Sequence, residues 1–77
     1  MIGYVIYGKR TGLRDRHKKP VFDKTFRALD SVGRRVTTLT NAMCYATKED
    51  AQDILDKPAT KKLVDAGLVL FEIRKAK

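Results

Sequence analysis

The chain has 77 residues, a length that fits one domain, residues 1–77, with a small hydrophobic core. Its only cysteine, Cys44, excludes an intramolecular disulfide, and its only histidine, His17, leaves too few ligands for a Cys/His zinc site. The formal net charge of +8 favours association with nucleic acid, anionic lipid or an acidic protein surface.

The positive charge is concentrated in the first half of the chain. Residues 1–36 contain ten Lys or Arg and three acids, a balance of +7, whereas residues 37–77 contain seven Lys or Arg and six acids, a balance of +1. The second half shows that near neutrality is attainable. The excess in the first half therefore points to one cationic binding surface.

Features that direct a protein to a membrane are missing from the sequence. No run approaches the roughly 20 apolar residues that cross a bilayer, and the apolar residues 2–7 lack the preceding basic segment of a signal peptide. One unpaired cysteine suits a reducing compartment. We therefore expect a soluble, cytoplasmic protein with no membrane partner, and we leave a homo-oligomer open as a source of extra stability.

The first predicted element is a β-strand over residues 2–8, with β-branched and aromatic side chains on both faces, as in an interior strand. Residues 9–19 follow with six Lys or Arg and a single large apolar residue, and Pro20 ends the segment. A segment of this composition cannot bury itself. It is predicted to be an exposed loop or a long hairpin tip.

Residues 20–33 allow two interpretations. Phe22, Phe26 and Leu29 have helical spacing, and Gly33 is suitably placed to follow a helix. Alternating side chains from Phe22 onward equally fit a strand, followed by a turn at 30–33 and a strand over 34–39. We favour the strand.

The predicted fold class is α+β, an antiparallel sheet of three or four strands with a Pro-broken helical segment, residues 48–66, on one face. A brief strand is expected within 40–46 and an apolar strand over 68–74. The first and last strands are the most apolar and are expected to lie centrally. If residues 21–32 are helical instead, the order becomes β-α-β-β-α-β, a ferredoxin-like sandwich.

Two short helices are predicted over 48–56 and 58–66. Thr47 can cap the first helix, and acids in its first turn suit the positive end of the helix dipole. Pro58 cannot continue that helix and instead opens the second. Gly67 is placed to end the second helix in a left-handed conformation.

The leading candidate site is the basic segment, helped by two arginines further along the chain. Lys and Arg side chains neutralise phosphates and release counterions, and arginine also forms bidentate contacts with phosphate or carboxylate. Tyr7 borders this segment and is a candidate for stacking on a base. The residues predicted to bind nucleic acid or an acidic partner are Lys9, Arg10, Arg14, Arg16, Lys18, Lys19, Arg34 and Arg35.

No catalytic, metal or cofactor site is predicted. His17 has no orienting carboxylate except the nearby Asp15, and no nucleophile is evident beside it. Cys44 reads as a small buried hydrophobe, since as a nucleophile it would need His17 as its base. The acids Glu49, Asp50, Asp53 and Asp56 have the spacing of an ordinary solvated helix face rather than of a metal site.

Residues 38–51 read Thr-Leu-Thr-Asn-Ala-Met-Cys-Tyr-Ala-Thr-Lys-Glu-Asp-Ala and follow an N-terminal Tyr-Val-Ile at residues 4–6. Over about a third of the chain this pattern resembles short proteins encoded by bacteriophages and prophages, most of them of unknown function. The resemblance implies a host cytoplasm and a setting in which tiny proteins bind and inhibit host machinery or defence complexes. It carries over no functional residues, and neither residues 9–19 nor Pro58 belong to its pattern.

Three functions are consistent with these features. The first is a non-enzymatic protein that contacts nucleic acid, alone or in a ribonucleoprotein complex, through the basic segment. The second is a phage-type inhibitor that docks the same surface on an acidic face of a host protein. The third and most remote is a minimal nuclease, for which Asp53 would be the first residue to test.

Overall fold

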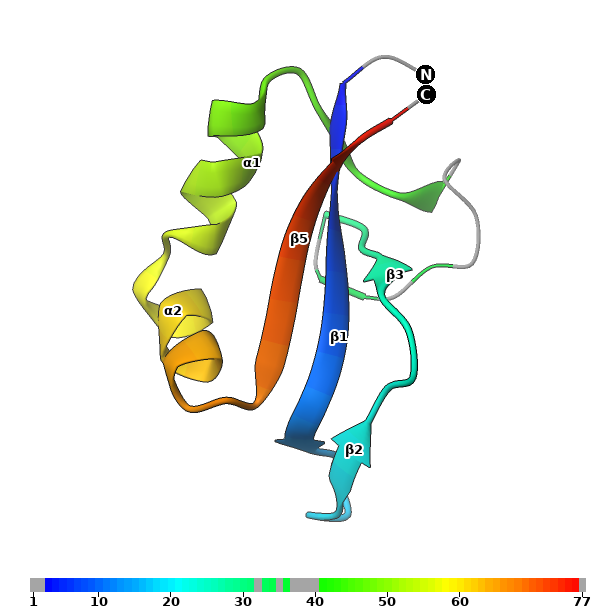
Figure 1. Ribbon diagram of the computed structural model, residues 1–77, viewed down its shortest axis with the longest axis vertical. Helices are drawn as coiled ribbons and strands as arrows, with labels where there is room; N and C mark the ends of the chain where they lie inside the picture. Colours follow the sequence, from blue (N-terminus) through cyan, green and yellow to red (C-terminus); the bar gives the residue numbers. More distant parts are fainter. Residues whose placement is uncertain (1–2, 32, 35, 37–40, 77) are drawn as a thin grey trace.

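The computed structural model describes residues 3–31, 33–34, 36 and 41–76. This part of the chain has the predicted α+β fold, an antiparallel sheet beside two helices (Figure 1). Among the described residues the sheet has five strands, more than expected because several are very short. They are β1 (Tyr4–Arg14), β2 (Pro20–Phe22), β3 (Arg27–Ala28), β4 (Cys44–Tyr45) and β5 (Val69–Lys75), and the helices are α1 (Lys48–Leu55) and α2 (Pro58–Asp65).

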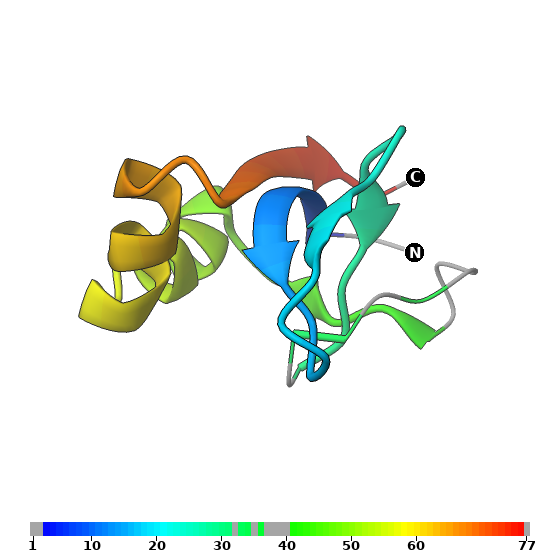
Figure 2. The same cartoon turned by 90° about the horizontal axis from the view of Figure 1, so that it is seen from below.

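The long strand β1 organises the sheet. On one side it pairs with β5 in an unbroken register from Tyr4 opposite Lys75 to Arg10 opposite Val69. It also pairs with β2, β3 and β4, so the predicted central place of the first strand is confirmed. The predicted central place of the last strand is wrong, because β5 pairs only with β1 among the described strands. Both helices contact β5 and lie along its outer side in Figures 1 and 2.

The basic segment is a twisted β-hairpin rather than a loop. β1 continues to Arg14, well past the predicted end at residue 8, and the chain returns in β2. The pairing register shifts between Thr11 and Leu13, and Gly12 there has φ +125°. A glycine bulge of this kind increases the twist of the strand pair. It turns the hairpin tip away from the rest of the sheet (Figure 1).

The strand interpretation of the ambiguous region is correct, and the helical one, with its ferredoxin-like order, is wrong. β2 and β3 both pair with β1, and the chain between them bends at Lys24 and Thr25. The predicted turn follows β3, since the N–H of Asp30 donates to the carbonyl of Arg34 at 2.9 Å. The predicted strand over 34–39 falls largely on residues 35 and 37–40, outside the described residues.

Both predicted helices form, each one residue shorter at its end. The Thr47 hydroxyl accepts the N–H of Asp50 at 3.1 Å, as the capping pattern predicts. Pro58 opens α2, and Gly67 follows its end with φ +74°. In the described part of the chain, no helix is long and apolar enough to cross a membrane.

The core is small and divided between the two faces of β1. On one face Val5 is completely buried against Ala28 and Ala76. On the other face Ile6 is buried, as is Ala51 of α1. The division follows from alternation along a strand whose residues are apolar on both sides. A core of this size is what a chain of this length can bury.

Candidate nucleic-acid interface

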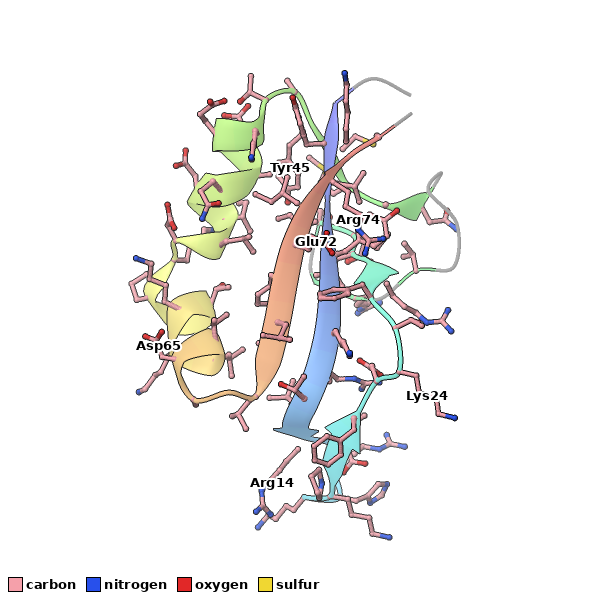
Figure 3. All side chains as sticks on the ribbon, in the orientation of Figure 1. Arg14, Lys24, Tyr45, Asp65, Glu72 and Arg74 are labelled. Carbon is pink, nitrogen blue, oxygen red and sulfur yellow. The ribbon has the colours of Figure 1, made fainter. Side chains whose placement is uncertain are left out.

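The tip of the β1–β2 hairpin carries four exposed cations of the predicted site. Arg14, Arg16, Lys18 and Lys19 are all exposed, and the tip contains one acid, Asp15. Among the described residues no salt bridge joins these four side chains to a carboxylate. Arg14 lies at the far end of the molecule from the chain termini (Figures 1 and 3).

Asp15 holds the backbone of the tip in place. One of its carboxylate oxygens accepts the N–H groups of His17 and Lys19, at 2.8 and 3.1 Å. Lys18 takes the left-handed conformation with φ +61°, and the Arg14 guanidinium donates to its carbonyl at 3.1 Å. The acid is therefore used to order the turn, and the cations around it are presented on a defined backbone.

Arg10 belongs to a different environment from the rest of the predicted set. Its Nε and Nη2 donate to the two carboxylate oxygens of Asp23, both at 3.0 Å, and its backbone N–H donates to the same group at 2.8 Å. The hydrogen bond to Asp23 raises the pKa of Arg10. This bidentate pair ties β1 to the chain that leads into β3. We assign Arg10 a structural role.

Arg34 is exposed in the turn that follows β3, where its N–H donates to the Asp30 carboxylate at 2.8 Å. With Lys9, Arg10 and Leu13 it lines a surface groove of about 570 Å³. The fold thus brings Arg34 next to the base of the hairpin, as the sequence hypothesis requires. Arg35 lies outside the described residues.

A second cationic group lies on one face of the β1–β5 pair. Directly paired residues of antiparallel strands share a face, and the register therefore places Arg74 on the same face of the pair as the buried Val5. The name open face is used here for the part of that face beyond Val5, which carries Tyr7, Lys9, Leu70, Glu72 and Arg74. Its cations and rings are in contact. The Arg74 guanidinium carbon lies 4.4 Å from the Tyr7 ring centre, and Lys9 Nζ lies 5.8 Å from that of Phe26.

Sequence reasoning missed Arg74 and Phe26. Arg74 lies 67 residues after Tyr7 in the chain, and only the pairing of β5 with β1 makes them neighbours. The predicted alternation over 68–74 does separate Arg74 from the apolar face of the strand, and this could have marked it as exposed. Tyr7 itself is not an open stacking surface, because Arg74 covers one side of its ring.

Two apolar side chains are exposed near these cations. Phe22 of β2 is 69% exposed, and Leu70 of β5 is 45% exposed. Phe22 pairs with Thr11 and Leu70 with Lys9, which places both on the same side of β1 as the open face. Exposed rings and aliphatic groups beside cations are typical of binding surfaces.

The alternative catalytic sites gain no support from the geometry. Cys44 pairs with Val5 near one end of β1, whereas His17 lies in the turn beyond the other end. At about 3.3 Å per strand residue, roughly 30 Å separates these ends. In the described part of the chain, no three His, Cys, Asp or Glu side chains gather where they could hold a metal ion.

Comparison of the chain with protein-family models, with curated proteins and with solved structures found no match.

Proposed function

We propose that the protein is a non-enzymatic binding protein that contacts the phosphates of nucleic acid through the tip of the β1–β2 hairpin. The observation that carries this proposal is the presence of four exposed cations, Arg14, Arg16, Lys18 and Lys19, on a turn whose only acid bonds to the backbone. Lys9 and Arg34 extend the cationic surface toward the sheet.

The chemistry of the tip suits phosphate. Arginine presents planar donors that match phosphate oxygens, and lysine adds a mobile point charge. Each phosphate that is neutralised releases counterions, so that binding strengthens as salt is lowered. Extension of the tip away from the sheet and the helices would let it follow a nucleic-acid backbone (Figure 1).

The proposal is tested by fluorescence anisotropy with labelled single-stranded RNA, single-stranded DNA and duplex DNA, at about 0.05 and 0.15 M salt. We expect binding that persists at the higher concentration. The double variant Arg14→Ala, Arg16→Ala should weaken binding to every sequence and reduce the slope of log affinity against log salt by about 2. Unchanged affinity in this variant would contradict the proposal.

The chain offers a matched control. Lys61→Ala with Lys62→Ala removes the same charge from exposed positions of α2, a helix on the other side of β5 from the hairpin (Figure 1). This control should bind as the parent protein does. Equal losses in the two double variants would show that net charge, rather than the hairpin, is responsible.

A second candidate function is binding to an acidic face of a protein, in keeping with the resemblance to phage-encoded inhibitors. The exposure of Phe22 among cations favours it, because buried aromatic anchors surrounded by polar contacts dominate protein interfaces. Affinity capture from lysate should then yield one saturable protein complex, and Phe22→Ala should abolish it while the fold is retained. A partner that Phe22→Ala still captures would contradict this second function.

A further inference from the structure

We propose that Arg74, stacked on Tyr7, is a platform for one unpaired base, so that the nucleic acid bound by this protein is single-stranded. This inference rests on the proposed function, since it names the form of the ligand that the hairpin tip holds by its phosphates. The base would lie on the open face, on the outer side of the guanidinium. Both faces of a guanidinium plane accept stacked rings, and RNA-binding proteins use arginine in this way.

The guanidinium is already oriented for this role. Its carbon lies over the Tyr7 ring, 4.4 Å from the ring centre, and 5.6 Å from the centre of the Phe26 ring. Both rings therefore border the guanidinium, and a base would stack on the part that they leave exposed. One nitrogen donates to the Glu72 carboxylate at 2.9 Å. A hydrogen bond to a guanidinium nitrogen lies near the guanidinium plane and does not block its faces. The Arg74 side chain nevertheless remains 45% exposed.

The charges around Arg74 favour a base over a phosphate. The Glu72 carboxylate, 46% exposed, offsets the positive charge of Arg74 and would repel a phosphate placed against the same group. Stacking depends on the planar shape of the guanidinium, so it is retained when Glu72 offsets the charge of Arg74. Glu72 therefore orients the Arg74 guanidinium through its hydrogen bond. Phosphate binding is assigned to the hairpin tip, where the Asp15 carboxylate accepts backbone N–H groups.

The platform and the tip lie along one strand. Arg14 lies seven positions after Tyr7 in β1, about 23 Å at the usual rise per strand residue. Lys9, Leu70 and Phe22 fall on the same side of β1 between them. Figure 2 shows β5 passing over β1 with the link from β2 to β3 beside its end, and Figure 3 shows Arg74 and Glu72 next to each other at β5.

Three ligands of equal backbone length test the proposal by anisotropy at about 0.15 M salt: a single strand of about ten thymidines, the same strand with abasic sugars throughout, and a duplex of the same length. The single strand and the abasic strand carry the same phosphates. Stacking of one base predicts at least about fivefold tighter binding to the thymidine strand than to the abasic strand. The duplex carries twice the phosphates, but its bases are stacked internally, so its affinity should not change in Arg74→Lys.

Arg74→Lys keeps the positive charge of the side chain and removes its planar guanidinium. It should bring the affinity for the thymidine strand down to that for the abasic strand, and leave the abasic affinity unchanged. The control is Arg27→Lys, the same substitution at an exposed β3 arginine, and it should change neither affinity. Tyr7→Leu should act like Arg74→Lys and Tyr7→Phe like the parent. Because Tyr7 packs against the core, the decisive result is that of Arg74→Lys.

The outcomes also separate this inference from the proposed function. Equal affinities for the thymidine strand and the abasic strand, unaffected by Arg74→Lys, would overturn the base platform and leave phosphate binding by the hairpin intact. Selective loss of thymidine-strand affinity in Arg74→Lys would establish the platform. Absence of binding to all three ligands would overturn both the platform and the proposed function.

Discussion

The hairpin and the helices of this protein use charged residues in opposite ways. Residues 9–24 contain seven Lys or Arg and two acids, a balance of +5, whereas residues 47–66 contain four lysines and five acids, a balance of −1. Both regions are largely exposed. Exposure alone therefore does not explain the excess of cations in the hairpin, since the helices are solvated with almost no net charge.

The acids explain the difference. In the hairpin, Asp15 orders the turn through backbone N–H groups and Asp23 forms a bidentate pair with Arg10. Both of its acids thus serve the architecture of the strand pair. In α1 the acids lie on the solvated surface, where Asp56 accepts from Gln52 at 3.0 Å, and they offset the neighbouring lysines. The hairpin surface is therefore cationic because it has few acids and because those acids are engaged in hydrogen bonds that order the hairpin.

Reversal of charge is expected to have the largest effect. Arg14→Glu with Arg16→Glu, and Lys61→Glu with Lys62→Glu, each lower the net charge from +8 to +4. Because the hairpin tip is proposed to hold the phosphates, the first pair should reduce nucleic-acid affinity by on the order of 100-fold, and the second pair by only a few fold. Anisotropy titrations at one salt concentration measure both.

The comparison fails if the two reversed variants lose affinity equally, because binding would then follow net charge. Circular dichroism of each variant is the control for folding. The four positions are exposed and make no salt bridge among the described residues, so we expect both variants to retain the parent spectrum.

Removal of Asp23, the partly buried acid of the hairpin, should have the next largest effect. Asp23→Ala breaks three hydrogen bonds to Arg10 and leaves a partly buried guanidinium without this partner. The expected loss is about 2–3 kcal/mol of unfolding free energy, measured by urea denaturation. Asp56→Ala, which removes one exposed hydrogen bond from α1, should cost within about 0.5 kcal/mol. If Asp23→Ala also costs no more than about 0.5 kcal/mol of unfolding free energy, the Arg10–Asp23 pair does not stabilise the hairpin.

The helical region could be predicted almost completely from the sequence because its determinants are local. The Thr47 cap, the proline at the start of α2 and the glycine after its end each act within one turn of chain. The hairpin was predicted only in outline. Gly12 marks a bulge within β1, whereas the composition of residues 9–19 predicted either an exposed loop or a long hairpin tip and did not show that β1 continues to Arg14.

The binding surface could be predicted only where it lies within one segment. The tip follows from composition, since its cations are consecutive or nearly so in the chain. The Arg10–Asp23 pair and the contact of Arg74 with Tyr7 depend on which strands pair and in which register. Strand pairing is set by long-range packing, which periodicity does not report. Sequence reasoning therefore did not anticipate the pairing of Arg10 with Asp23 and missed Arg74.

Loss of the cap of α1 should weaken the helical region without affecting binding. Thr47→Ala removes the acceptor of the Asp50 N–H and should cost about 1 kcal/mol, or roughly 4–8 °C in Tm. Thr47→Ser keeps the hydroxyl and is the matched control. Because the cap lies in the helical region, nucleic-acid affinity below the transition should equal that of the parent. A change in affinity would mean that the two regions are coupled.

Alkaline pH should produce the smallest change in stability. This change is expected at Tyr45 of β4, a strand that contacts α1, and so it tests the helical side of the comparison. Burial raises the pKa of Tyr45 above its ordinary value of 10.0. A phenol with a raised pKa in the folded state keeps its proton where the unfolded chain loses it. Its contribution to stability is therefore complete below about pH 10 and is lost as pH rises through the folded pKa. Tyr45→Phe should lose less stability than the parent between neutral pH and about pH 11, as measured by urea denaturation at each pH. An identical loss of stability at alkaline pH in both proteins would show that ionisation of the partly buried Tyr45 is not its source.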